Sequence, residues 1–305
     1  MTVTLRTATA ADLSDAYDVQ REASEAVGMA IGNVAGPADG QVPAKFRHEL
    51  QHGRFLIAEV DGRMAGFGAV FQRAGVAFLA TFYVRPDAQA AGLGVGQALL
   101  AALFEGLGPA RCVVSSGVHR ALALYARNDL LPRWPLLMLD ARSDRLAMQD
   151  DAEFGVEPAD VHDPDLLTWD AEIAGRGERS VDQRYWRDEY CADPYWIERA
   201  GRRVGYAYIQ KLFASPDAPW NPDAVCLGPI GVRESSDAAG AVLAVAGAAG
   251  PLAERLLIDV PGAHPALPVL LDAGFRIFYQ ATFCSSSASD IFDPRRYTPA
   301  DTITF

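Results

Sequence analysis

A run of small residues directly before a helical pattern has the composition of an anion-binding site. The run is Gln89–Gly96, which reads Gln-Ala-Ala-Gly-Leu-Gly-Val-Gly. Small side chains let backbone N–H groups approach a phosphate, and the start of a helix adds N–H groups without intrahelical partners and about half a positive charge. Glycines at this spacing also occur where helices pack closely, so the spacing alone leaves both interpretations open.

Two common nucleotide-binding patterns do not fit this run. A phosphate-loop NTPase requires Gly-Lys-Ser/Thr at the end of its loop, and none follows. A dinucleotide-binding unit requires an acidic residue about 20 positions further on, where this chain has Cys112-Val113-Val114. The strand-like segments before the run are joined by tight turns, which also disfavours a parallel nucleotide-binding unit.

The elements around the run predict antiparallel strands followed by alternating helices and strands. Phe55–Val60 and Arg63–Val70 flank Asp61-Gly62, a strong two-residue hairpin turn, and Val76–Val84 predicts a third strand. After the glycines, apolar residues recur every four positions on one helix face, at Val95, Leu99, Leu103 and Leu107. Strand, helix and strand patterns then follow at Cys112–Ser115, Ala121–Ala126 and Leu136–Leu139.

The second half of the chain repeats this plan faintly. Ala200–Tyr206 resembles Asp61–Phe67, and Leu256–Val260 resembles the strand that begins at Cys112. A charged, proline-containing stretch, Asp140–Asp165, separates the halves, and 305 residues are enough for two domains. We therefore predict two tandem domains, residues 1–148 with the anion site and residues 149–305 without it.

The first half resembles the GCN5-related N-acetyltransferase (GNAT) superfamily. The family's cofactor motif, Gln/Arg-x-x-Gly-x-Gly/Ala, follows a strand that ends in Val-x-Pro, and here Val84-Arg85-Pro86 precedes Gln89–Gly94. The resemblance implies an α/β (α+β) fold, with a mixed, mostly antiparallel sheet flanked by helices in each half, and acetyl-CoA as co-substrate. The implied cofactor-binding residues are Phe82, Tyr83, Val84, Gln89, Ala90, Ala91, Gly92, Leu93, Gly94, Val95, Gly96 and Tyr125.

The resemblance also implies how these residues act. The loop amides would hold the cofactor pyrophosphate, and the backbone of Phe82, Tyr83 and Val84 would pair with the pantetheine arm beside a strand bulge. Leu124-Tyr125 resembles the family's Leu-Tyr, whose tyrosine commonly protonates the departing thiolate. A half-buried core tyrosine is the alternative interpretation.

The general base is harder to place. Many relatives carry an acid on the strand before the loop, where this chain has Phe78 and Ala80. Glu22 and Glu25 are candidate bases because the first helix often borders the acceptor pocket in the family. His119, a water chain, direct attack by a neutral amine, and the terminal carboxylate at Phe305 are the alternatives.

The second half keeps the fold pattern without the site. No cofactor motif follows Gly228–Arg233, and Glu234 and Asp237 would repel a pyrophosphate. Leu270 stands where the resemblance would require the tyrosine. We therefore expect a degenerate GNAT-like domain, which tandem relatives often use to complete the acceptor pocket.

Composition and charge narrow the partners. The formal net charge of −12 disfavours nucleic acid and anionic membranes and favours a cationic acceptor. The four cysteines are scattered and no apolar run approaches the roughly 20 residues of a membrane helix, so we expect a cytoplasmic protein without a metal site. We predict an N-acetyltransferase that acts on a small-molecule amine rather than a protein, as a monomer or homodimer. A non-catalytic acyl-CoA sensor and a transferase of another acyl group are the rivals.

Overall fold

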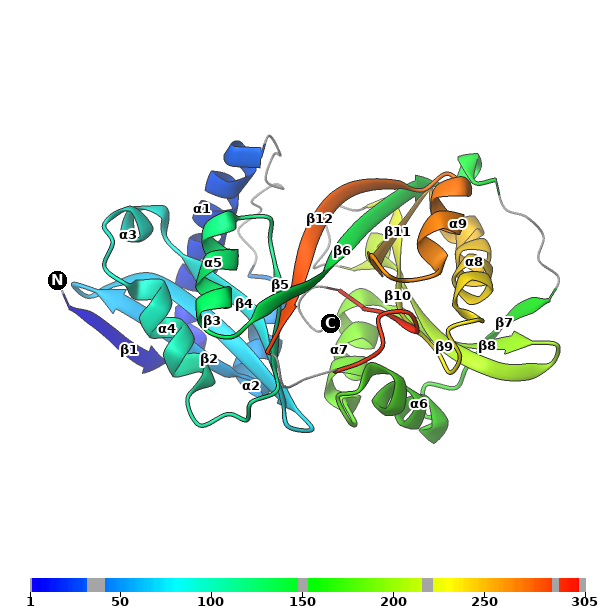
Figure 1. Ribbon diagram of the computed structural model, residues 1–305, viewed down its shortest axis with the longest axis horizontal. Helices are drawn as coiled ribbons and strands as arrows, with labels where there is room; N and C mark the ends of the chain where they lie inside the picture. Colours follow the sequence, from blue (N-terminus) through cyan, green and yellow to red (C-terminus); the bar gives the residue numbers. More distant parts are fainter. Residues whose placement is uncertain (1, 32–41, 148–152, 216–221, 287–290, 302–305) are drawn as a thin grey trace. The chain divides into compact units, whose positions relative to one another are not determined.

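The chain divides into two compact units. The computed structural model describes residues 2–31, 42–147, 153–215, 222–286 and 291–301. Unit 1 comprises Met1–Leu131 and Cys284–Ser289, and unit 2 comprises Pro132–Phe283 and Asp290–Phe305. Each unit has a mixed, mostly antiparallel sheet flanked by helices, which confirms the predicted fold class (Figure 1).

The sheet of unit 1 runs in the order β1–β2–β3–β4–β5. Strands β1 to β4 pair antiparallel, whereas β5 pairs parallel with β4. Asp61 and Gly62 have φ values of 51° and 78°, as the predicted hairpin turn requires. The strands are β1 (Val3–Thr7), β2 (Arg54–Val60), β3 (Arg63–Arg73), β4 (Val76–Val84) and β5 (Arg111–Ser115).

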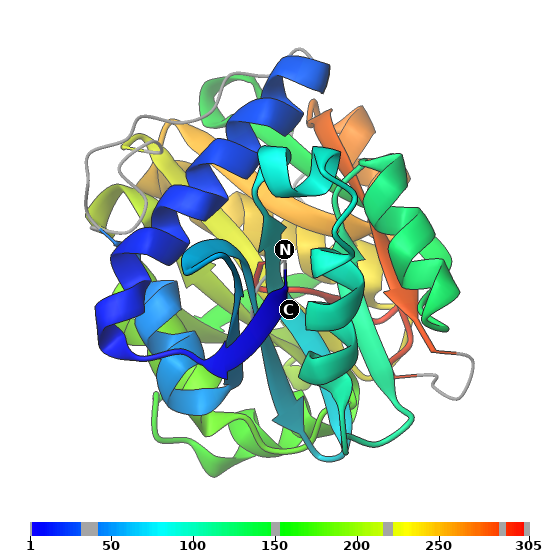
Figure 2. The ribbon, with the colours of Figure 1, turned by 90° about the vertical axis from the view of Figure 1, so that its left-hand side faces the viewer.

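Helices cover both faces of this sheet (Figure 2). One face carries α1 (Leu13–Ile31) and α2 (Ala44–His52), and the other carries α4 (Val95–Phe104) and α5 (His119–Arg127). A one-turn helix, α3 (Pro86–Ala90), lies between the end of β4 and the glycines, with proline at its first position. Short 3-10 helices lie at Ala10–Asp12, Ser143–Arg145, Leu212–Ala214 and Gly250–Leu252.

Unit 1 is completed by a segment from the far end of the chain. The Ser286 N–H donates to the Arg111 carbonyl at 2.9 Å. The Ser286 hydroxyl accepts the Arg111 N–H at 3.2 Å and donates to the Pro109 carbonyl at 2.6 Å. Cys284 lies in the apolar core that α4 covers. The first half of the sequence therefore does not contain the whole of unit 1.

Unit 2 repeats the pairing plan of unit 1, in the order β12–β6–β11–β10–β9–β8–β7. Strands β7 to β10 pair antiparallel, β10 and β11 pair parallel, and β13 also pairs with β10. The strands are β6 (Leu131–Arg142), β7 (Phe154–Pro158), β8 (Ala192–Arg199), β9 (Arg202–Gln210), β10 (Ala224–Val232), β11 (Arg255–Pro261), β12 (Arg276–Ser285) and β13 (Tyr297–Thr298). The helices are α6 (Pro164–Ala174), α7 (Ser180–Tyr190), α8 (Ala238–Ala249) and α9 (Ala266–Asp272).

The boundary between the two units lies at the start of β6. It pairs antiparallel with β11 along its length, for example Leu139 with Ile258. The sequence placed this strand in residues 1–148 because the charged, proline-containing stretch taken as the boundary, Asp140–Asp165, follows Leu136–Leu139. The unit change before Pro132 differs from that boundary because pairing with a strand more than a hundred residues away leaves no local signal.

Candidate active site

Strands β4 and β5 part at the centre of unit 1. They pair only from Ala77 to Leu79 on β4, and β4 then runs on to Val84 beside β3 alone in the part of the chain that the structure describes. A bulge at Ala80 shifts the β3–β4 register at the same point. Because a bulge bends and twists its strand, β4 leaves β5 with one edge open to a ligand.

The backbone of Phe82 and Val84 faces this open edge. The Arg85 N–H donates to the Ala65 carbonyl of β3 at 2.8 Å. Hydrogen-bonding direction alternates along an antiparallel strand, so Tyr83 also bonds toward β3. The N–H and C=O groups of Phe82 and Val84 therefore point away from β3, as pairing with an extended ligand requires.

The run Gln89–Gly96 forms the end of α3, a turn and the start of α4. Gly92 and Gly94 have φ values of 67° and 72°, in the left-handed region. That backbone costs other residues roughly 1 kcal/mol. An added side chain at either position would meet nothing within 4 Å, so the conformation rather than the space calls for glycine.

The start of α4 presents a row of backbone donors. Gly94 is the N-cap, and Ala98 donates to its carbonyl at 3.0 Å as the first intrahelical hydrogen bond. The N–H groups of Gly94, Val95, Gly96 and Gln97 precede that bond and have no intrahelical acceptor. Such donors at a helix start suit a phosphate or pyrophosphate group.

Two side chains brace the loop against β4 and α5. The Gln89 Nε2 donates to the Val84 carbonyl at 2.6 Å, and its Oε1 accepts from Arg120 Nη1 at 3.3 Å. Arg120 is exposed on α5 and adds a positive charge beside the loop. The motif glutamine therefore fixes the turn that the glycines make.

Tyr125 lies on α5 with its side chain turned toward β4. Its ring is 6.2 Å from that of Phe82, between centroids, and the residue is only 4% exposed. Burial raises the pKa of the phenol well above its ordinary value, and nearby Tyr83 and Cys284 raise it further. The phenol is neutral at physiological pH and available to donate a hydrogen bond or a proton.

Of the two acids predicted as bases, Glu22 is engaged in an ion pair and Glu25 is exposed. The Arg85 guanidinium pairs with Glu22 through Nη1 and donates from Nε to the Met64 carbonyl at 2.8 Å. Glu22 therefore ties α1 to the end of β4. Glu25 is exposed on α1, and His119 is exposed at the start of α5. Phe305 lies outside the described residues.

The sequence reasoning missed a carboxylate on the opposite face. Glu49 of α2 is fully buried, and its Oε2 accepts the hydroxyl of Thr81 at 3.1 Å. Thr81 directly follows the bulge residue of β4. The available signal was Phe46, three residues before Glu49, which places the acid on the apolar face of the helix.

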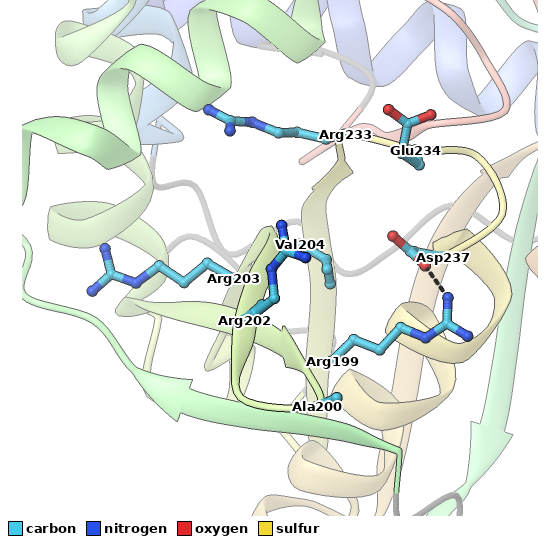
Figure 3. Close-up of a pocket in the computed structure, with 8 residues that line it drawn as sticks. All are labelled: Arg199, Ala200, Arg202, Arg203, Val204, Arg233, Glu234 and Asp237. Carbon is cyan, nitrogen blue, oxygen red and sulfur yellow. Dashed lines mark hydrogen bonds and ion pairs between the residues drawn. The ribbon is translucent and has the colours of Figure 1, made fainter.

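Unit 2 carries a pocket of about 460 Å³ at the ends of β8, β9 and β10 (Figure 3). Arg199 donates to Asp237 at 2.8 Å, and Arg233 lies 3.8 Å from Glu172. The carboxylates offset the arginine charges, so we assign no anion site here. The lining residues are Arg199, Ala200, Arg202, Arg203, Val204, Arg233, Glu234 and Asp237.

Three further observations concern metals, thiols and membranes. No three His, Cys, Asp or Glu side chains gather as metal ligands within the described ranges. All four cysteines are free thiols. Among the helices that the structure describes, none has the length and apolarity to cross a membrane.

Residues 19–129 match the model of the Acetyltransferase (GNAT) family. This span holds β4, the glycine loop and Tyr125. No protein of curated function matches the sequence significantly.

Solved structures share the fold along nearly the whole chain. A candidate acetyltransferase from Pyrococcus horikoshii has a TM-score of 0.73 at 15% identity, over 99% of this chain and 96% of that one. A tandem GNAT protein from the clavulanic acid biosynthesis pathway has a TM-score of 0.61 at 17% identity, over 95% and 100%. A GCN5-related N-acetyltransferase from Sphaerobacter thermophilus has a TM-score of 0.61 at 16% identity, over 99% and 98%. Residues 19–129 of the chain thus match the Acetyltransferase (GNAT) family, within a fold that the chain shares with a tandem GNAT protein.

Proposed function

We propose that the protein is an acetyl-CoA-dependent N-acetyltransferase whose acceptor is the primary amine of a small molecule. The open edge of β4, which leads to the glycine turn and the start of α4, carries this proposal. The edge offers backbone groups to the extended pantetheine arm. The helix start offers donors to the pyrophosphate.

The reaction is direct transfer. The neutral amine attacks the thioester carbonyl, a C–N bond forms and the C–S bond breaks. A backbone N–H on the open edge, at Val84, stabilises the oxyanion. Tyr125 gives its proton to the departing thiolate, because its phenol carries a proton at neutral pH and its ring lies beside Phe82 of the open edge.

The acceptor and setting follow from charge and fold class. A net charge of −12 favours a cationic amine over an anionic partner. We further propose that the protein acts in the cytoplasm, as a monomer or a homodimer, on a small amine. Acetyl is the proposed acyl group, and succinyl or another acyl group is tested alongside it.

The experiment measures free coenzyme A released from acetyl-CoA in the presence of a panel of amines. We expect turnover with the wild type and none with Gly92→Glu, whose carboxylate would repel the pyrophosphate. Gly75→Glu is the matched control. Gly75 also has a positive φ, 82°, and open space around it, but it lies in the β3–β4 turn at the far end of β4.

Calorimetric titration with acetyl-CoA separates the rival functions. Binding with turnover on an amine supports the transferase. Binding without turnover on any amine assigns a non-catalytic acyl-CoA sensor instead. An absence of binding by the wild type contradicts both.

A further inference from the structure

The buried carboxylate of Glu49 lies beside the point where β4 and β5 part. Glu49 is 0% exposed and Thr81, whose hydroxyl it accepts, is 4% exposed. Thr81 comes one residue after Ala80, the bulge residue of β4. The carboxylate is therefore anchored at the bend that opens the edge.

Successive side chains of β4 lie on opposite faces of the unit 1 sheet. The side chains of Phe82 and Val84 lie on the α4 and α5 face, with Tyr125. Thr81 and Tyr83 therefore lie on the face covered by α1 and α2, where Tyr83 packs against the apolar residues beneath these two helices. A cofactor whose pyrophosphate rests at the start of α4 occupies the first face, which leaves the second face to the amine.

A carboxylate on that second face has a chemical use. Alkyl amines carry a proton at neutral pH, since the ordinary pKa of a lysine-like amine is about 10.4. The amine must shed protons before and during attack. Burying a carboxylate is costly, so such groups are kept mainly where they are paired or do work. Strand β4 itself has Phe78 before the bend and Ala80 at the bend, and neither side chain takes a proton.

We infer that Glu49 is the general base that takes the proton of the attacking amine, and that Thr81 positions its carboxylate. The inference rests on the transferase function proposed above. As the C–N bond forms, the amine proton passes to Glu49. As the C–S bond breaks, the Tyr125 proton passes to the thiolate. Exchange with solvent after product release returns both groups to their starting protonation states.

The decisive variant is Glu49→Gln, which keeps the shape and removes the base. We expect kcat to fall about 100-fold or more, the range of a lost general base. The Kd for acetyl-CoA, measured by calorimetry, should stay within about twofold of the wild type. Glu105→Gln makes the same change at an exposed site of unit 1 and should leave turnover unchanged.

Two further measurements separate base catalysis from a structural role. Formate should restore part of the turnover of Glu49→Ala, because it fits the space left and accepts a proton there. Thr81→Val should lower kcat about tenfold and Thr81→Ser should not, because only serine keeps the hydroxyl. The threonine pair decides the matter if both glutamate variants fail to fold.

The outcomes are distinct for the two proposals. Turnover of Glu49→Gln within about threefold of the wild type overturns the role of Glu49 and leaves the transferase standing. The same follows if Thr81→Val and Thr81→Ser behave alike. A wild type that binds acetyl-CoA but acylates no amine overturns the transferase, and the role of Glu49 with it.

Discussion

In each unit two parallel strands pair over only part of their length, and the gap between them is filled differently in the two units. In unit 1, β4 leaves β5 after Leu79 and its edge stays open among the described residues. In unit 2, β10 and β11 pair only as far as Leu227, and the register breaks there in the same way. Strand β13 then pairs antiparallel with β10 and also contacts β11. The place of a ligand strand is thus taken by the chain itself.

The inserted strand is firmly anchored. Arg179 Nη2 donates to the Tyr297 hydroxyl at 2.6 Å and the guanidinium also pairs with Asp170 at 2.6 Å. Tyr206 donates its hydroxyl to Asp170 at 2.6 Å. Gln210 donates to the Ala300 carbonyl at 2.8 Å. Because these groups are buried, removing the segment from the gap would leave the Arg179 and Gln210 donors each short of a hydrogen-bond partner.

The comparison shows that the sheet order alone does not make a site for an acyl-CoA. Both units have the bend, but within the described ranges only unit 1 combines it with a glycine turn and an open edge. Unit 2 has Glu234 and Asp237 before α8 and its own strand in the gap. We therefore expect one acetyl-CoA per chain.

The largest effect should come from breaking the anchor of β13. Arg179→Met leaves Asp170 buried without its cation, and breaking a buried pair in this way costs about 3–5 kcal/mol. Urea unfolding followed by tryptophan fluorescence measures the loss in unit 2, because all five tryptophans of the chain belong to that unit. A loss under about 1 kcal/mol would show that the strand is held by other contacts.

Removing the phenol tests the open edge of unit 1. Tyr125→Phe should lower kcat about 100-fold, which is about 2.7 kcal/mol of barrier, and leave the Kd for acetyl-CoA nearly unchanged. The reason is that the hydroxyl acts on the departing sulfur, while the ring packing against Phe82 is kept. Tyr208→Phe, a buried tyrosine of unit 2, is the matched control and should leave turnover intact. Equal turnover in Tyr125→Phe removes its assigned role.

Matched glycine substitutions sharpen the contrast between the loops. Gly94→Ala and Gly201→Ala both place alanine at a positive φ with open surroundings, and each should cost roughly 1 kcal/mol of stability. Only Gly94→Ala should also weaken acetyl-CoA binding, because it distorts the donors at the start of α4. Calorimetric titration of both variants checks this, and equal affinities would separate the glycine turn from cofactor binding.

The smallest effects should come from an ion pair that recurs in both units. Arg85 meets Glu22 of α1 after β4, and Arg233 lies 3.8 Å from Glu172 of α6 after β10. The acids are about half exposed, so Glu22→Gln should cost under about 1 kcal/mol and Glu172→Gln less. Thermal unfolding compares them. A Glu22→Gln variant that folds normally but loses turnover would return Glu22 to the catalytic candidates.

Local signals made much of unit 1 predictable. The Asp61-Gly62 turn, the helix from Val95 and the helix of Tyr125 each rest on residues next to one another in sequence, and the structure confirms all three elements. The match of residues 19–129 confirms the family resemblance of that span. The cofactor roles of the loop residues and Tyr125 stay predictions.

The unpredicted features all depend on distant contacts. The position of Glu49 beside the bend of β4 depends on its contact with Thr81, which is 32 residues further along the chain. The pairing of Ser286 with Arg111 and the insertion of Tyr297 beside β10 join segments with no shared local pattern. Composition and periodicity predict which residues of a helix or strand are buried and where turns occur. They do not predict which strands pair with each other.

The exchanged end of β12 has a consequence for how the protein is made. Cys284 and Ser286 are synthesised roughly 150 residues after the rest of unit 1. At about 5–20 residues per second, β5 waits about ten to thirty seconds on the ribosome for the segment that bonds to Arg111. A gene fragment that ends near residue 148 would yield a domain with a bare sheet edge and an uncovered core. We therefore expect unit 1 to fold fully only when both halves of the chain are made.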